Sequence, residues 1–335
     1  MLEKIRIKSS SGAYPIYLGR GLLDDLNNFI NGQRKILIVT DSGIPEEYLK
    51  KVLQSVKDPE VVILERGENS KSFEEYKKII SRMMGREFSR QDAVLALGGG
   101  MVGDIAGFAA STYMRGLDFY NFPTSLLAQV DSSVGGKTAI NIDGIKNQIG
   151  TFYPPKAVVI DTDTLKTLDK DLKAEGLVEA IKMGACLDKE FFEFLEKEDA
   201  LSQIQETIGR AISIKAGVVE KDEKESGFRR VLNFGHTIGH ALELQGDLYH
   251  GQAVGLGMIC ESSGQANARI RKILEKYGLP TEFRIDRDKF KDSLKHDKKL
   301  GKDDITTVMT GEIGTYLFKD MTGQELLELV HKIGG

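Results

Sequence analysis

Short apolar runs alternate with amphipathic stretches through the first 161 residues of this 335-residue chain. Continuous apolar runs of strand length are typical of parallel strands that are buried on both faces. They occupy residues 35–41, 61–65, 93–97 and 157–161, and shorter strand-like segments occupy residues 5–8 and 16–18. The helical period predicts helices at residues 22–30, 46–56, 73–84 and 105–112. This alternation predicts an α/β domain built on a parallel sheet.

The helical period dominates beyond residue 161. It predicts helices at residues 165–187, 190–195, 201–219, 231–244, 252–268, 269–277 and 324–333, with a short hairpin at 305–309 and 315–319. A chain of 335 residues can bury two hydrophobic cores. We therefore expect an α/β domain over residues 1–167 and a mainly α-helical domain over residues 168–335.

The composition narrows the class of protein without naming a function. Hydrophobic residues make up 41% of the chain and charged residues 29%, and the net charge of −4 gives no sign of a nucleic-acid partner. Cys186 and Cys260 lie in apolar contexts without a CxxC spacing, which is typical of reduced cysteines in a cytoplasmic protein. Neither a signal peptide nor a transmembrane span is expected, because the first residues are charged and the apolar runs are short.

A glycine-rich segment directly follows the predicted strand at residues 93–97. Residues 98–103 match GxGxxG by letter, and Asp104 and Gly107 follow. The match alone is weak evidence, because no convincing acidic residue stands about 20 positions later. Glycines at such a turn nevertheless let backbone N–H groups approach a phosphate at a helix N-terminus. The alternative is a tight turn, but three consecutive glycines exceed its needs, so we predict a Rossmann-like domain that binds a dinucleotide pyrophosphate.

Two polar segments then predict ligand-binding loops. Residues 122–138 are rich in hydroxyls and glycine and carry Asp131 and Lys137, and a second segment contains Lys146 and Asn147. Loops of this kind at the edge of a sheet usually bind something. Arg115 stands where a predicted helix ends, a position that is equally compatible with a solvated turn arginine.

Three of the five histidines, His236, His240 and His250, lie within fifteen residues. His236 and His240 are four apart in a helical pattern and share a face. Glu179 lies three residues before Lys182 among apolar neighbours, which predicts partial burial and a carboxylate for the same site. One carboxylate and two imidazoles leave positions open, as a catalytic zinc site requires. The alternative is that all three histidines are ordinary and partly buried.

Two hydrolase classes are excluded by their motifs, since HTIGH is not the HExxH of zinc peptidases and no GxSxG is present. Cations instead gather in the glycine- and asparagine-rich motifs of a net acidic chain, which predicts a small polyanionic substrate. These cations are Lys137, Lys146, Lys182, Lys215, Arg229, Lys298 and Lys299.

The chain resembles the 3-dehydroquinate synthase family, within the sugar phosphate cyclases, motif by motif between about residues 67 and 309. The matching segments read ALGGGMVGDIAGFAASTYMRG, FPTSLLAQVDSSVGGKTAIN, GIKNQIGTFYPP, GLVEAIKMG, RRVLNFGHTIGHALE, HGQAVGLGM and HDKK. The resemblance implies conversion of 3-deoxy-D-arabino-heptulosonate 7-phosphate to 3-dehydroquinate and phosphate in the shikimate pathway. It also implies NAD, a divalent metal (Zn²⁺ or Co²⁺) and a cytoplasmic homodimer.

The resemblance also assigns roles to individual residues. The metal ligands would be Glu179, His236 and His250. The phosphate would meet His240, Lys137 and Asn147, and also Arg115 from the neighbouring subunit. The remaining substrate contacts would be Asp131, Lys182, Lys215, Arg229, Asn233 and one lysine of the 298–299 pair, taken as Lys299. The NAD contacts would be Gly99, Gly100, Asp104, Lys137 and Lys146, with Asp41, Glu68, Lys71, Thr124 and Ser125.

Two departures and three alternatives qualify this interpretation. Gln252 replaces the usual Glu of HGEAV, which puts the hydrogen-bond support of His250 in question, and Asp169 replaces a usual proline. Another cyclase, such as 2-deoxy-scyllo-inosose synthase, would act on a substrate without a carboxylate, against which Lys215 and Arg229 argue. A metal-dependent polyol dehydrogenase would need no phosphate pocket, and an inactive binding protein would not need the metal set.

Overall fold

The computed structural model describes residues 2–334 except residues 11, 247 and 297–303. The chain divides into two compact units, residues 1–169 (unit 1) and residues 170–335 (unit 2). The predicted Lys298–Lys299 pair lies outside the described residues. None of the described helices is long and apolar enough to span a membrane.

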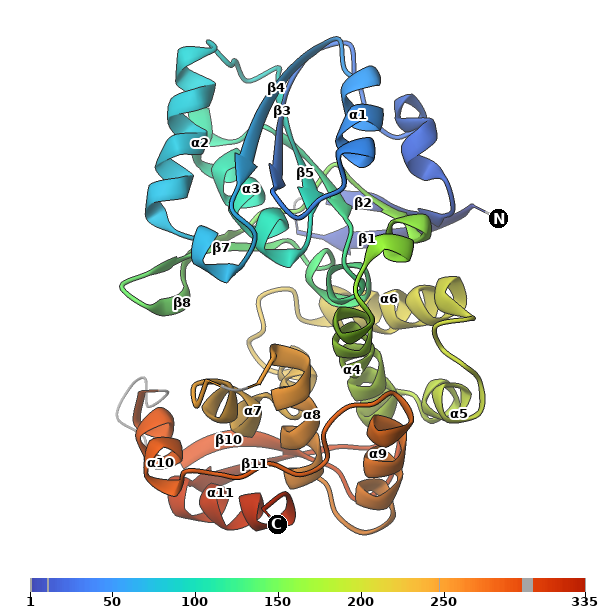
Figure 1. Cartoon of the computed structure of the whole chain (residues 1–335), viewed down its shortest axis with the longest axis vertical. Coiled ribbons are helices and arrows are strands. Elements are labelled where there is room, and N and C mark those ends of the chain that lie inside the picture. Colours follow the sequence, from blue (N-terminus) through green and yellow to red (C-terminus); the bar gives the residue numbers. More distant parts are fainter. Residues whose placement is uncertain (1, 11, 247, 297–303, 335) are drawn as a thin grey trace. The chain divides into compact units, whose positions relative to one another are not determined.

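Unit 1 is built on a seven-stranded sheet with the order β1-β2-β9-β6-β5-β3-β4 (Figure 1). Strands β1 and β2 are antiparallel, and the other neighbouring strands pair in parallel. The strands are β1 (Glu3–Ser9), β2 (Gly12–Gly19), β3 (Lys35–Asp41), β4 (Asp58–Leu64), β5 (Ala93–Gly98), β6 (Asp118–Pro123) and β9 (Ala157–Asp161). A separate hairpin, β7 (Lys137–Ile142) and β8 (Ile145–Phe152), occupies the segment where only loops were predicted.

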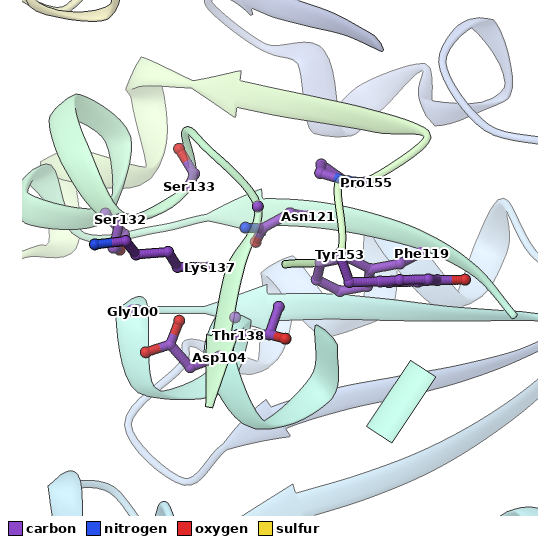
Figure 2. Close-up of a pocket in the computed structure, with 14 residues that line it drawn as sticks. Gly100, Asp104, Phe119, Asn121, Ser132, Ser133, Lys137, Thr138, Tyr153 and Pro155 are labelled. Atoms are coloured by element: carbon purple, nitrogen blue, oxygen red, sulfur yellow. The ribbon is translucent and has the colours of Figure 1, made fainter. Parts of the chain in front are cut away.

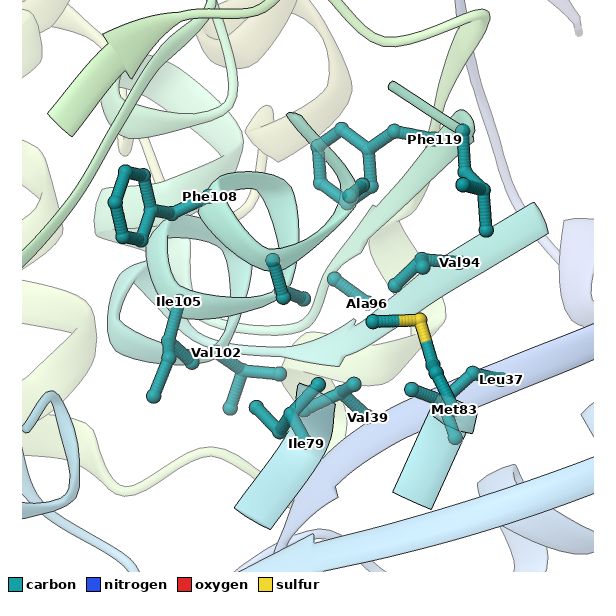
Figure 3. Close-up of a cluster of buried hydrophobic side chains, with 14 of the residues drawn as sticks. Leu37, Val39, Ile79, Met83, Val94, Ala96, Val102, Ile105, Phe108 and Phe119 are labelled. Carbon is teal, nitrogen blue, oxygen red and sulfur yellow. The ribbon is translucent and has the colours of Figure 1, made fainter. Parts of the chain in front are cut away.

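The sheet of unit 1 is covered on both faces because its strands are apolar on both faces. Leu37 and Val39 of β3 pack with helices α2 (Phe73–Gly85) and α3 (Gly100–Thr112), as Figure 3 shows. Ile36 and Ile38, which point the other way, pack with helix α1 (Glu46–Gln54). The period-2 alternation of a strand explains this division. It also explains why the central strands read as continuous apolar runs.

The helix predicted at residues 22–30 is wrong. Two short 3₁₀ turns, Leu22–Asp24 and Leu26–Asn28, replace it. The carboxylate of Asp161 accepts hydrogen bonds from the Gly21 and Leu23 backbone N–H groups, each at 2.9 Å. The two turns are separated at Asp25, whose φ of −142° and ψ of 59° lie outside the helical region, so no continuous α-helix forms.

Unit 2 is mainly helical, and the fold class predicted for the whole chain is confirmed. Its elements are α4 (Lys170–Leu187), α5 (Lys189–Lys197), α6 (Ile204–Lys221), α7 (His236–Glu243), α8 (His250–Cys260), α9 (Gly264–Lys276), α10 (Arg287–His296), β10 (Asp304–Met309), β11 (Leu317–Thr322) and α11 (Gly323–Leu329). The helix predicted at 252–268 is wrong, because the chain breaks after Cys260. Extended Ser263 and left-handed Gly264 start a new helix there.

Candidate active site

Helix α4 of unit 2 carries a buried pair of opposite charges. Glu179 and Lys182 lie one turn apart, and their side chains are only 2% and 3% exposed. Lys182 Nζ donates a short hydrogen bond to Glu179 Oε2. Glu179 Oε1 is buried and has no hydrogen-bond partner. An unpartnered buried carboxylate oxygen is costly, so this atom indicates a place where a cation can bind.

Two histidines face that oxygen. The Nε2 atoms of His236 and His250 lie 3.7 and 4.0 Å from Glu179 Oε1. One ligand atom from each of the three residues can be chosen so that all lie within 4.8 Å of one another. The donor set of two imidazoles and one carboxylate suits a divalent metal such as zinc and leaves positions open. The residues predicted as metal ligands are therefore brought together by the fold.

The other nitrogen of each ring is hydrogen-bonded. His236 Nδ1 donates to the Phe234 carbonyl oxygen at 3.2 Å, and His250 Nδ1 donates to Glu243 Oε2 at 3.3 Å. Both contacts favour the tautomer whose lone pair is on Nε2, the atom that faces Glu179. Burial and the Lys182 charge hold the pKa of His236 well below its usual value, so this ring is neutral. Burial also opposes the charged form of His250, but Glu243 and Glu179 outweigh it and raise its pKa.

Glycines let the two histidine-bearing helices approach backbone to backbone. A Cβ at Gly257 of α8 would lie 2.0 Å from the Gly235 carbonyl oxygen, and one at Gly239 of α7 would lie 3.0 Å from that of Ala253. Gly235 itself has φ 80°, a left-handed conformation that favours glycine. The separation of His236 and His250 therefore depends on these contacts.

A buried carboxylate joins the same two helices. Glu261 directly follows α8, is fully buried, and accepts hydrogen bonds from Gly235 N at 2.6 Å and Ile238 N at 3.4 Å. These two N–H groups belong to the first turn of α7, where a carboxylate is favourable. Burial nevertheless raises the pKa of Glu261 to about 8. Glu261 thus connects the end of one ligand helix to the start of the other.

The departure at Gln252 does not remove the support of His250. Gln252 Oε1 accepts from the Tyr249 backbone N–H at 3.2 Å and so caps α8, while Glu243 holds the imidazole. Sequence reasoning missed Glu243, although its place three residues after His240 was a usable signal. It also missed Glu261 and Glu175, a buried acid on α4 whose pKa burial raises to about 7. Nothing local in the sequence marks Glu261.

The predicted substrate-binding cations of unit 2 are buried. Lys215 and Arg229 are 4% and 3% exposed, which is rare for these residues unless they are paired or functional. Arg229 Nη1 donates to the Glu223 carbonyl oxygen at 2.7 Å, and Asn233 Nδ2 donates to Glu225 Oε1 at 2.9 Å. The side chain of His240 is exposed.

The glycine-rich turn of unit 1 leaves no room for side chains. Gly99 is the N-cap of α3, and a Cβ at Gly100 would lie 2.9 Å from Ser132 Oγ. Figure 2 shows Gly100, Asp104 and Lys137 around a cavity of about 10 Å³, which is room for a single water. Two other predicted cofactor residues lie nearby in the chain. Thr124 directly follows β6, and the Oγ atom of Ser125 would lie 3.4 Å from a Cβ placed on Gly99.

Four predicted residues of unit 1 meet in one polar cluster. The nearly buried Lys71 Nζ donates to Asp104 Oδ2 and to Asn147 Oδ1, each at 2.5 Å, and lies 3.7 Å from Glu68 Oε1. Asn147 was predicted to contact phosphate, but its side chain lies among the residues predicted to contact NAD. Its φ of 57° is left-handed, which asparagine tolerates.

The other predicted residues of unit 1 lie in further turns and on strand β8. Asp41 accepts from Gly43 N at 2.8 Å within its own turn, and Lys146 is exposed on β8. Asp131 lies in the π-helical turn Ala128–Ser132. Exposed Arg115 follows α3 in a turn whose residues 114–116 all have positive φ, at 48°, 72° and 124°. Such a backbone is strained and presents this side chain in a defined direction.

Glu179, His236 and His250 form a candidate metal centre, in a fold that solved cyclase structures share. Family models for the N-terminal and C-terminal parts of 3-dehydroquinate synthase match residues 61–175 and 176–300. The chain therefore belongs to the 3-dehydroquinate synthase family, as its motifs predicted.

Curated relatives agree with this assignment along the whole chain. The 3-dehydroquinate synthase of Desulforamulus reducens is 40% identical and covers 97% of this chain and 99% of its own length. That of Clostridium botulinum is also 40% identical, with 95% and 98% covered.

Solved structures with less sequence similarity share the fold. A 2-deoxy-scyllo-inosose synthase complexed with carbaglucose-6-phosphate, NAD⁺ and Co²⁺ has a TM-score of 0.90 at 24% identity, covering 98% of this chain and 99% of that one. The 2-epi-5-epi-valiolone synthase of Streptomyces hygroscopicus, with NAD⁺ and Zn²⁺ bound, has a TM-score of 0.83 at 24% identity, with 95% of each chain covered.

Proposed function

We propose that this chain is a 3-dehydroquinate synthase, which converts 3-deoxy-D-arabino-heptulosonate 7-phosphate to 3-dehydroquinate and phosphate. The observation that carries the proposal is the buried, unpartnered Glu179 Oε1 facing two Nε2 atoms. It occurs in a chain 40% identical, over nearly its whole length, to proteins of that name.

The metal would be held by Glu179, His236 and His250, and zinc is favoured because its usual donors are imidazole and carboxylate. A divalent ion there supplies a Lewis acid to an alcohol oxygen of the substrate. The residues fit this role, since Glu179 Oε1 lacks any other partner and both Nε2 lone pairs face it. Lys182 Nζ donates a hydrogen bond to the second oxygen of Glu179 and so balances its charge.

NAD would bind to unit 1, whose fold is shared with two solved enzymes that hold NAD⁺. It supplies reversible hydride transfer at the C5 alcohol, which makes the neighbouring C6 proton acidic. Gly99 and Gly100 form the N-terminus of α3, which has no side-chain cap, so its first backbone N–H groups are suited to a pyrophosphate. The proposed contacts are Gly99, Gly100, Asp104, Lys137 and Lys146, with Asp41, Glu68, Lys71, Thr124 and Ser125.

The resemblance to the family assigns the substrate contacts residue by residue. Arg229, Lys215 and Asn233 of unit 2 would bind the carboxylate and hydroxyls, and Arg is well shaped for a carboxylate. His240 of unit 2, with Lys137 and Asn147 of unit 1, would hold the phosphate near the C6 proton, a contribution of proximity. Asp131 and Lys182 would line the reacting ring, and one lysine of the 298–299 pair, taken as Lys299, would close over the substrate. After phosphate is lost, return of the hydride would reduce the C5 ketone. Ring opening and an intramolecular aldol closure would then give dehydroquinate.

The proposal includes a homodimer in the cytoplasm. Arg115 would reach the phosphate bound by the neighbouring subunit, since its strained turn directs a guanidinium outward and guanidinium binds phosphate in two-pronged fashion. Two buried, unoxidised cysteines favour a reducing compartment.

The test is an incubation of the protein with heptulosonate phosphate, trace NAD and Zn²⁺, following phosphate and dehydroquinate together. Both should form with no accumulation of NADH, because the hydride returns to the substrate. Glucose 6-phosphate, which has no carboxylate, serves as the comparison and should be a poor substrate. Turnover of glucose 6-phosphate alone would favour 2-deoxy-scyllo-inosose synthase, and stoichiometric NADH from a polyol would favour a dehydrogenase.

A further inference from the structure

Three imidazoles surround the candidate metal centre, one more than the proposed ligand set uses. The ring centroids of His236 and His240 are 5.3 Å apart, those of His236 and His250 5.5 Å, and those of His240 and His250 6.0 Å. Two groups in the described part of unit 2 each bring three ligand atoms within 4.8 Å of one another. The inner group is Glu179, His236 and His250, and the outer group is His240, Glu243 and His250.

The two groups have the same donor chemistry. Each offers two imidazoles and one carboxylate, a set that binds a divalent ion with positions left open. His240 and Glu243 are three residues apart on α7, so they share a face of that helix. The groups meet at His250, whose Nδ1 lies 3.3 Å from Glu243 Oε2 and whose Nε2 lies 4.0 Å from Glu179 Oε1.

The groups differ in burial and in how their oxygens are satisfied. Glu179 is 1% exposed, whereas the side chain of His240 is exposed. Glu179 Oε1 has no hydrogen-bond partner, while Glu243 Oε2 already accepts from His250 Nδ1. An ion in the inner group relieves an unsatisfied oxygen, but an ion in the outer group must displace a hydrogen bond. The outer group is therefore the more accessible and the weaker of the two.

From this difference in burial and in hydrogen bonding, we propose that the outer group is a first docking position, from which the divalent cation passes to the inner group. The step rests on the proposed metal centre. The ion exchanges its bonds to His240 and Glu243 for bonds to His236 and Glu179, and moves from Nδ1 to Nε2 of the His250 ring. The ring proton takes the opposite path through solvent, and the Nδ1–H···Glu243 hydrogen bond forms again. Because a neutral imidazole has one lone-pair nitrogen, the two positions fill one at a time.

The test uses the full-length protein, freed of metal by chelation, and Co²⁺ alone as the ion. The visible absorption of bound Co²⁺ gives the stoichiometry and the dissociation constant. Rapid mixing followed by the same absorption gives the association rate, and displacement by a chelator gives the dissociation rate. His240→Ala should lower both rates by about tenfold, a modest loss for a site that gathers ions locally. The dissociation constant should stay the same, because His240 is absent from the final ligand set. His240→Gln is the second variant, and His331→Ala, which removes a histidine far along the sequence, is the matched control.

The wild-type protein should bind one Co²⁺ per chain, and His331→Ala should match it in both rates. Unchanged rates in both His240 variants would reject the docking position and leave the metal centre intact. A faster dissociation at an unchanged association rate would also reject the docking position, and it would make His240 a ligand of the final site. Two Co²⁺ bound per chain would reject the docking position as well. Absence of Co²⁺ binding by the wild type would instead reject the metal centre, and the proposed function with it.

Discussion

The two units bury charge in different ways. Among the described residues, unit 1 buries three charged side chains, Glu60, Lys71 and Asp161. Each is satisfied: Glu60 by Arg82 and Arg86, Lys71 by Asp104 and Asn147, and Asp161 by backbone N–H groups. The described part of unit 2 buries seven, which are Glu175, Glu179, Lys182, Lys215, Asp222, Arg229 and Glu261.

The charges of unit 2 are less completely satisfied. Glu175 Oε1 and Glu179 Oε1 are buried without hydrogen-bond partners. A buried charge that lacks a partner destabilises a fold unless a ligand completes it. Unit 1 offers its ligand a backbone turn cleared of side chains, while unit 2 offers buried charges that a ligand must balance. Four predictions test this difference.

The largest effect is expected from the buried metal ligands. Glu179→Ala and His250→Ala should each lower metal affinity more than the roughly 10–100-fold that loss of an outer-shell partner costs, and activity should disappear. Gly100→Ala in unit 1 should keep the metal and lose NAD, because its Cβ would crowd Ser132 Oγ. Metal analysis and NAD binding by the purified variants check both. A Gly100→Ala protein that had lost its metal would contradict the expected difference between the two units.

Exchange of subunits tests whether Arg115 of one subunit acts in the site of the other. Arg115→Ala in unit 1 and Lys215→Ala in unit 2 should each be nearly inactive. In a mixed dimer, one site would combine an intact Lys215 with Arg115 from the other subunit, so activity should return on mixing, toward one working site per mixed dimer. No recovery, with exchange confirmed by mass, would mean that Arg115 serves its own subunit.

A smaller effect is expected at the carboxylate that joins α7 to α8. Glu261→Ala leaves two N–H groups unpartnered, which should cost about 1–3 kcal/mol in the free energy of unfolding, and it should weaken metal binding about tenfold. Glu60→Ala is the matched control, since it removes a buried carboxylate from unit 1. Both should melt earlier, but only Glu261→Ala should bind Co²⁺ more weakly. Equal metal affinity in the two variants would assign Glu261 a purely structural role.

The smallest effect is a pH dependence of stability in the metal-free protein. Burial raises the pKa of Glu175 to about 7, from an ordinary value of 4.5. Between these values the unfolded chain binds fewer protons at this residue, so its contribution to the free energy of unfolding falls as pH rises. The Gln side chain of Glu175→Gln stays neutral. The free energy of unfolding of this variant should therefore rise relative to that of the wild type by up to about 1.4 kcal/mol for each pH unit between these two pKa values. Melting curves at pH 4.5, 6 and 7.5 give this difference, and a constant difference would contradict it.

The local pattern predicted two strands of unit 1 to the residue. The strands at 35–41 and 157–161 match the structure at both ends, because a fully buried strand must be apolar on both faces. The hairpin β7–β8 was missed, since β8 is exposed along most of its length and carries no apolar pattern. Residues 22–30 have a helical pattern, but Asp25 leaves the helical region and divides them into two short 3₁₀ turns.

The family, the fold class and the residue types of the site could be predicted from the amino-acid sequence alone, because long motifs and apolar periodicity are local properties. The sequence also indicated that Glu179, His236 and His250 belong together. The folded chain was needed to show that Glu243 supports His250 and that Glu261 caps α7. These contacts join segments through the approach of α7 and α8, which depends on glycines packing against backbone. Nothing local in the sequence marks Glu261, and the spacing of Glu243 from His240 does not show which ring it contacts, since both contacts are set by distances that exist only after the helices have packed.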